Sequence, residues 1–165
     1  MPLLAALRDA GMELSSVWDL VNTTTAPPPN TVSILLDHLS GEYPDRVREG
    51  IARALAIPQA RIGWTQLVDH FQKDRDRSGL GSKFAIASAL ATIADESTID
   101  DLIGLAMDRR HGQNRIPFIK TLARASAPRA RDALQQLALD SDTSAEVKRT
   151  LKNMGRRQRH RRQHG

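Results

Sequence analysis

Four pairs of apolar residues recur along this chain of 165 residues with the spacing of a single helix face. The two members of each pair lie four residues apart, and successive pairs begin 35, 32 and 29 residues after one another. Because residues four apart share one face of an α-helix, the pattern indicates one packing face that is used four times. Such a repeat is typical of helical hairpins that stack into a solenoid. The pairs are Ile51/Leu55, Ile86/Leu90, Phe118/Leu122 and Val147/Leu151.

The rest of the sequence fits two helices in each repeat. Three consecutive prolines interrupt the stretch 23–30, and Pro44 and Pro128 lie where helices are expected to begin. The spacing of Thr143 and Glu146 is that of a capping box, and Gly155 is placed to end the last helix. No segment alternates with a period of two, so we predict an all-α chain. The expected first helices are 32–39, 63–71, 99–107 and 129–139, the expected second helices are 45–55, 82–93, 114–125 and 144–154, and a helix over 13–21 is expected to cap the N-terminal end.

Several of these segments are similar to HEAT repeats. The stretch Asp45-Arg-Val-Arg-Glu-Gly-Ile-Ala-Arg-Ala-Leu55 resembles the second helix of such a repeat, and Phe84–Leu90 and Ala130–Leu137 are similar to neighbouring HEAT helices. Over residues 12–154 the chain resembles small bacterial HEAT-repeat, armadillo-like proteins of unknown function. The resemblance implies a right-handed α-solenoid of about four hairpins over residues 1–154. It departs from many HEAT repeats in one respect, since Pro44 and Asp45 reverse the usual Asp-Pro order of the turn.

The net charge of the chain is concentrated at its C-terminal end. The five arginines among the last eleven residues account for the whole formal net charge of +5. A basic run without apolar residues predicts a disordered, solvated tail over residues 155–165. Its arginines are also candidates for phosphate contacts, although no aromatic side chain is interleaved to stack on bases. They are Arg156, Arg157, Arg159, Arg161 and Arg162.

Alignment of the four expected second helices on their apolar pairs reveals two positions rich in cations. The inner basic position lies three residues before the first apolar member, about 60° from the centre of the packing face. Basic side chains there commonly bind turn carbonyls or acids in HEAT repeats, so we interpret this position as structural. Its occupants are Arg48, Lys83, Arg115 and Ser144.

The outer basic position lies two residues after the first apolar member, about 200° round the helix and therefore toward solvent. Its occupants are Arg53, Ser88, Lys120 and Arg149, and Arg124 extends the row by one turn. In HEAT-like proteins the second helices usually line the concave surface that binds ligands. We therefore expect Arg53, Lys120, Arg124 and Arg149 to bind a partner protein that carries an acidic segment.

These observations favour a non-enzymatic scaffold. The alternative is a nucleic-acid-binding HEAT-fold protein, such as a base-repair enzyme, that uses the same ridge and the arginine-rich tail. A HEAT-like tetrapyrrole lyase is suggested by the resemblance alone. The chain has no cysteine, no glycine-rich phosphate loop and no nucleophile motif, so we assign no catalytic residue, cofactor or metal. No apolar run approaches the ~20 residues needed to span a bilayer, and the expected location is the cytoplasm.

Three further features receive structural interpretations. Asp37-His38 and Asp69-His70 are 32 residues apart, but neighbours in sequence diverge by about 100° on a helix, so repeat similarity explains them better than a metal site. Trp18 and Trp64 accompany apolar runs and are expected in the core. The polar stretch 108–115 is expected to be an inter-helix turn.

Overall fold

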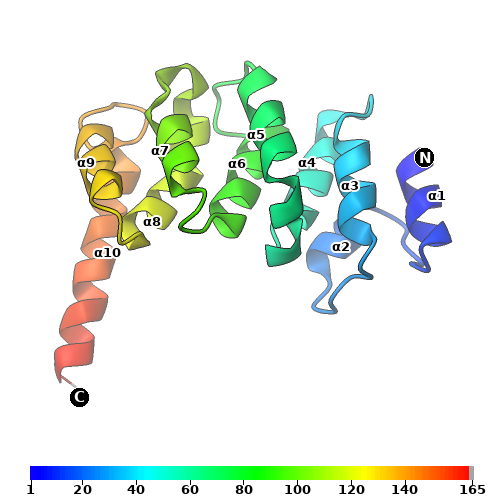
Figure 1. Cartoon of the computed structure of the whole chain (residues 1–165), viewed down its shortest axis with the longest axis horizontal. Helices are drawn as coiled ribbons and strands as arrows, with labels where there is room; N and C mark the ends of the chain where they lie inside the picture. The colour runs from blue at the N-terminus through cyan, green and yellow to red at the C-terminus, as the bar shows by residue number, and fades with distance from the viewer. Residues whose placement is uncertain (164–165) are drawn as a thin grey trace. The chain divides into compact units, whose positions relative to one another are not determined.

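The computed structural model describes the backbone of residues 1–163 and the side chains of residues 1–156. All the regular elements in these described residues are helices, as the sequence predicted. The chain divides into two compact units: unit 1 comprises Met1–Arg75 and Leu80–Ile93, and unit 2 comprises Asp76–Gly79 and Ala94–Gly165. None of the helices described is both long and apolar enough to cross a membrane. The helices are labelled in Figure 1.

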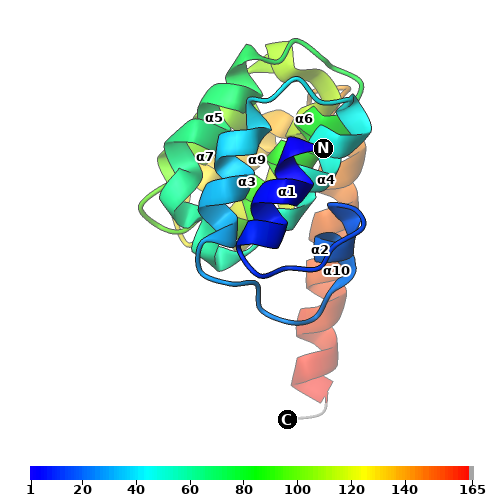
Figure 2. The same ribbon diagram turned by 90° about the vertical axis from the view of Figure 1, so that its right-hand side faces the viewer.

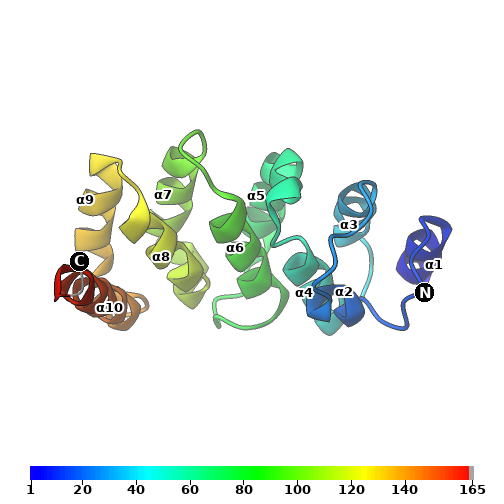
Figure 3. The ribbon, with the colours of Figure 1, turned by 90° about the horizontal axis from the view of Figure 1, so that it is seen from below.

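Unit 1 consists of two helical hairpins and two N-terminal helices. In the first hairpin α3 packs against α4, in the second α5 packs against α6, and α4 lies along α6. Of the N-terminal helices, α1 packs on α3 and α2 on α4, an arrangement visible in Figures 2 and 3. The elements are α1 (Pro2–Asp9), α2 (Trp18–Asn22), α3 (Thr31–Leu39), α4 (Asp45–Ala54), the 3₁₀ segment η1 (Pro58–Gly63), α5 (Trp64–Lys73) and α6 (Gly81–Ile93).

Unit 2 repeats this plan with two further hairpins. The first helices α7 and α9 pack against each other, as do the second helices α8 and α10, so the unit has two layers (Figure 3). The elements are α7 (Ile99–Met107), the 3₁₀ segment η2 (Arg109–Arg115), α8 (Ile116–Arg124), α9 (Pro128–Leu137) and α10 (Ser144–Gln163).

The apolar pairs that defined the register form the core of the second helices. Both members of the first three pairs are buried, and so is Val147 of the fourth. Leu151 is 50% exposed, which corrects the expectation of a fourth complete pair. In the described chain α10 packs mainly on α8 and α9, and these contacts leave Leu151 half exposed.

The N-terminal end differs from the sequence expectation. The helix expected over 13–21 is reduced to the single turn of α2, and an unexpected helix, α1, precedes it. Leu3 and Leu7 lie four residues apart on α1 and are fully buried against the first-helix layer. The segment that covers the end of this layer is therefore α1, while α2 covers α4.

The last helix continues beyond the expected boundary. Gly155 was expected to end it, but α10 runs on to Gln163, and Gly155 does not have a positive φ. A Cβ at this position would meet no atom within 4 Å, so nothing in the packing requires a glycine there. Arginine and glutamine favour helix formation, which explains why the tail backbone is helical up to Gln163 instead of irregular. In Figure 1 the C-terminal half of α10 extends past the ends of α8 and α9.

Two of the three helix-start signals predicted from the sequence lie where expected, and the third forms a different contact. Pro128 is the first residue of α9 and Pro44 immediately precedes α4, as predicted. Thr143 does not form the predicted capping box, because its buried hydroxyl donates instead to the carbonyl of Leu137 at 2.7 Å.

Candidate functional site

The inner basic position is structural in both repeats where its cation is buried. Lys83 of α6 is 1% exposed, its ammonium donates to the carbonyl of Asp74 at 2.5 Å, and it lies over the ring of Phe71. This cation binds the end of α5 to the start of α6, which fixes the second hairpin of unit 1. The interpretation drawn from the sequence is confirmed for this residue.

Arg115 has the corresponding role in unit 2, and it is also 1% exposed. Its guanidinium donates to the carbonyl of Gly112 at 2.8 Å, to that of Ala106 at 3.2 Å and to the Asp140 carboxylate at 3.0 Å. The same carboxylate contacts Arg109 at 3.1 Å. The cluster therefore joins the end of α7, the η2 turn and the loop between α9 and α10.

Electrostatics within this cluster favour the ionised carboxylate. Burial acts to raise the pKa of Asp140, but the backbone N–H of Asp142 and the charges of Arg115 and Arg109 outweigh it, so the pKa is lowered. In the adjoining turn, a side-chain hydrogen bond from Arg110 lowers the pKa of Asp108 to about 2. Both groups are anionic at neutral pH, which matches a structural salt-bridge role.

The polar turn 108–115 is structural, as expected. Gly112 has a φ of +55°, and a Cβ there would lie 2.7 Å from the backbone oxygen of Arg77. Buried Asn114 donates from its amide to the backbone carbonyl of Asp76 at 2.8 Å. The segment 76–79 is thereby held on the η2 turn within unit 2.

The cations at the outer basic position are exposed, and they belong to both units. Arg53 of α4 lies in unit 1, where it pairs with Glu49 at 2.7 Å. Lys120 and Arg124, one turn apart on α8, and Arg149 of α10 lie in unit 2. Ser88, the one uncharged occupant, donates its hydroxyl to the carbonyl of Phe84 within α6.

Three of the four predicted partner-binding residues line one groove. This α8–α10 groove has a volume of about 230 Å³ and contains Lys120 and Arg124 on one wall and Arg149 on the other. Arg53 does not line it. The full lining is Lys120, Arg124, Glu146, Arg149, Thr150, Asn153 and Met154.

The charge of the groove is predominantly positive. Glu146 is its single acidic residue, and this carboxylate accepts hydrogen bonds from Arg149 and from the hydroxyl of Thr150. No salt bridge among the described residues engages Lys120 or Arg124. The one acid of the groove pairs with Arg149, so Lys120 and Arg124 face the groove with no such salt bridge of their own, and an anionic group entering it would meet both.

A larger pocket adjoins this groove at Arg124. Its volume is about 490 Å³, and it is formed by the segment before α7, the end of α8 and the loop before α9. The sequence does not predict this pocket, because alanines and loop residues form much of its wall and no charge pattern marks them. Its lining is Ala94, Asp95, Glu96, Ile99, Thr121, Arg124, Ala125, Ser126 and Ala127.

The two histidines singled out in the sequence are hydrogen-bonded to hydroxyl groups. His38 contacts Tyr43 at 2.7 Å, and His70 contacts Ser40 at 3.1 Å. Burial lowers the pKa of His70, against the opposing charge of Asp69. These contacts account for both side chains within the first-helix layer of unit 1.

The two tryptophans differ in burial. Trp64 is buried at the start of α5, as predicted, whereas Trp18 is half-buried and lies under the guanidinium of Arg46 at 5.1 Å. The expectation of a core position is therefore wrong for Trp18. Its helix α2 is short and packs at the edge of unit 1, which leaves one side of the indole open to the Arg46 side chain.

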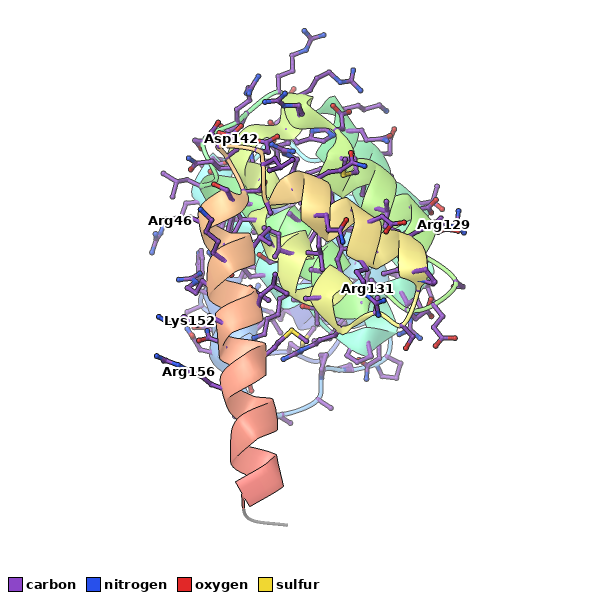
Figure 4. All side chains as sticks on the ribbon, turned by 90° about the vertical axis from the view of Figure 1, so that its left-hand side faces the viewer. Arg46, Arg129, Arg131, Asp142, Lys152 and Arg156 are labelled. Atoms are coloured by element: carbon purple, nitrogen blue, oxygen red, sulfur yellow. The ribbon has the colours of Figure 1, made fainter. Side chains whose placement is uncertain are left out.

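The predicted tail contacts lie at the end of α10. Arg156 is exposed on this helix, and Figure 4 shows it projecting away from the helices of unit 2. The side chains of Arg157, Arg159, Arg161 and Arg162 lie outside the described residues. Comparison of the chain with protein-family models, curated proteins and solved structures found no match.

Proposed function

We propose that this chain is a non-enzymatic scaffold of HEAT-like repeats that binds an acidic segment of a partner protein through the α8–α10 groove. The observation that carries the proposal is the convergence of Lys120, Arg124 and Arg149 on one groove with a single acid in its lining. Carboxylates of an extended segment complement this charge arrangement.

The arrangement of helices supports the scaffold part of the proposal. Within each unit, second helices lie on second helices, and in unit 2 the first helices also lie on first helices. Repetition of this stacking through the chain would give the α-solenoid expected from the HEAT resemblance. In such a fold the row of second helices forms a continuous surface on which a partner can lie.

The composition of the groove supports a peptide ligand. Its polar groups include the hydroxyl of Thr150 and the amide of Asn153, and Met154 supplies a flexible apolar side chain. No aromatic side chain lines it, so stacking of nucleic-acid bases has no platform there. Acidic side chains flanked by small apolar residues fit these properties.

Charge reversal in the groove tests the proposal. The probe is a fluorescein-labelled oligo-glutamate peptide, and the readout is fluorescence anisotropy at low and at physiological salt. Exchange of Lys120→Glu or Arg149→Glu should weaken binding about 2- to 10-fold each, because each removes an exposed ion pair and adds a repulsion. Helical content and Tm should remain nearly unchanged.

The matched control is Arg131→Glu, an equal charge change on the exposed face of α9 (Figure 4). Arg131 does not line the groove, so this variant should lose affinity only through the general change of net charge. If Arg131→Glu weakens the peptide as much as Lys120→Glu does, the groove is not the binding site. If Lys120→Glu unfolds unit 2, the residue is structural and the assignment is wrong.

A further inference from the structure

A row of cations runs along α10 outside the groove. Lys148, Lys152 and Arg156 are spaced by four residues and are all exposed. At 100° per residue they fall within an arc of about 80°, and at 1.5 Å per residue they span about 12 Å of the helix. We call these three residues the α10 stripe, and Figure 4 shows that Lys152 and Arg156 project to the same side of the helix.

The stripe has no counter-charge on its own helix. Glu146 is the single acidic residue of α10, and it pairs with Arg149 on the groove side. Among the described residues, no salt bridge involves Lys148, Lys152 or Arg156. These three charges therefore take no part in an ion pair of the described residues and are open to an external anion.

The helical backbone beyond Gly155 makes the stripe part of a longer rod. The 20 residues of α10 span about 30 Å, and the sequence from Arg156 to Gln163 contains no acid. In Figures 1 and 4 this part of α10 extends clear of the other helices of unit 2. A straight basic rod that extends from a folded body can lie against a long, regular array of negative charges.

We propose that α10 binds the phosphate backbone of double-stranded nucleic acid through the α10 stripe, without sequence preference. Phosphates of one strand rise about 3.4 Å each along the duplex axis while they wind around it, so a straight row of about 12 Å contacts about two or three of them. Flexible lysine and arginine side chains match such an array without fixed geometry. Because the sequence of α10 contains no Phe, Tyr or Trp, it lacks the large aromatic platforms on which single-stranded bases stack, which favours a duplex.

The first test measures the salt dependence of binding. The probe is a fluorescein-labelled DNA duplex of mixed sequence, titrated with the full chain by anisotropy at several salt concentrations. Each phosphate contact contributes about 0.9 to the slope of log K against log salt. Lys148→Gln/Lys152→Gln/Arg156→Gln should therefore reduce the slope by up to about 2.7 and weaken binding at least tenfold at low salt.

The control removes the same number of exposed cations elsewhere in unit 2, as Lys120→Gln/Arg129→Gln/Arg131→Gln. This variant should keep most of the slope, because these residues lie on α8 and α9 and not on the stripe. Because it includes the groove residue Lys120, the control variant should weaken binding of the oligo-glutamate peptide while duplex binding is largely kept. The two sites can thus be distinguished. Equal losses of slope in the two triple variants would overturn the proposal.

The second test changes the helix without changing its charge. Gly155→Pro breaks α10 between Lys152 and Arg156, whereas Gly155→Ala fits without contact and favours the helix. The proline variant should bind the duplex several-fold more weakly, and the alanine variant should bind at least as well as the parent. Unchanged binding by the proline variant would overturn the role of a continuous helix.

Two competing polyanions decide whether the stripe fits a duplex. Vesicles of phosphatidylserine and phosphatidylcholine and the oligo-glutamate peptide are tested at the same ionic strength. The duplex should compete best, and the triple glutamine change in the stripe should affect the duplex most. If vesicles or peptide compete equally and depend equally on the stripe, α10 is a general polyanion surface and the proposal fails.

Discussion

Replacement of buried Arg115 should destabilise unit 2 more than replacement of any exposed cation in the chain. The variant Arg115→Met preserves a long side chain but removes three hydrogen bonds. It removes the guanidinium donors from the carbonyls of Gly112 and Ala106 and one counter-charge from Asp140. Loss of one partner of a buried ion pair typically costs 3–5 kcal/mol.

The contacts that Asp140 keeps determine how much stability Arg115→Met should lose. Asp140 is 9% exposed and retains Arg109 at 3.1 Å and the backbone N–H of Asp142 at 3.0 Å. Its charge is therefore not left isolated, and we expect about 3 kcal/mol, the lower end of the range. Asp140→Asn should cost about 1–2 kcal/mol, because the Arg115 guanidinium keeps both carbonyl acceptors and the Asp142 carboxylate at 3.6 Å and loses only the charge of Asp140. A domain of ordinary stability, about 5–15 kcal/mol, would survive either change.

The assay is urea unfolding at pH 7, followed by far-ultraviolet circular dichroism. Trp18, Trp64 and Tyr43 all lie in unit 1, so their fluorescence reports that unit alone and serves as an internal reference. A double-mutant cycle with Arg115→Met and Asp140→Asn should give a coupling of about 1 kcal/mol or more. Arg131→Met, on the surface of α9, should leave the urea midpoint unchanged.

Two results would refute this reasoning. A loss below about 1 kcal/mol for Arg115→Met would mean that water satisfies the carbonyls of Gly112 and Ala106 at little cost. Additive effects of Arg115→Met and Asp140→Asn would mean that the pair is not an energetic unit.

Three further predictions concern unit 2. Gly112→Ala should destabilise it by about 2 kcal/mol or more in urea, since the positive φ and the nearby Arg77 oxygen both oppose a Cβ, whereas Gly104→Ala in open space on α7 should be neutral or stabilising. The pKa of Asp140 is lowered in the folded state. Its contribution to stability is therefore present above the unfolded pKa of about 3.9 and is lost as the pH falls through the folded pKa. Asp140→Asn should flatten the dependence of Tm on pH below about pH 4. Leu151→Gln should leave Tm unchanged because Leu151 is half exposed, and an equal loss to that of a buried core leucine would contradict the burial seen here.

The hairpin register could be predicted from sequence because it depends on local periodicity. The paired apolar residues placed the expected second helices 45–55 and 82–93 within a residue or two of α4 and α6. The structural role of Lys83 could also be predicted, because a basic residue recurs at the same position relative to the apolar pair. Such features depend on residues within one helix and the helix it packs against.

Features that depend on the chain ends could not be predicted in the same way. Leu151 matches the apolar pattern, but the packing of α10 on α8 and α9 leaves it half exposed. Leu3 and Leu7 form too short a pattern to distinguish a helix from an apolar stretch. Gly155 was misjudged because helix propensity of the basic residues that follow it outweighs the preference of glycine for a helix end.

The groove was predicted only in part, because its formation requires two helices to be placed side by side. Lys120 and Arg149 were selected by their common position in the repeat, and Arg124 by its distance of one turn from Lys120. Their convergence depends on the packing of α8 against α10, and that packing brings Asn153 to the same groove. Arg53 shares the repeat position but belongs to unit 1, so the position alone does not define the site.

The same residue type serves two purposes according to its angle on the helix. Arg115 and Lys120 are five residues apart, which separates them by about 140° around the axis. At the inner angle the cation is buried against turn carbonyls, so its replacement lowers the stability of the fold. At the outer angle the cation faces solvent, so its replacement changes only the affinity for a ligand. Stability and affinity are therefore separable by position: Arg115→Met should lower the urea midpoint, whereas Lys120→Glu should lower affinity at an unchanged midpoint. If Lys120→Glu also lowered the midpoint, the angle would not separate the two roles.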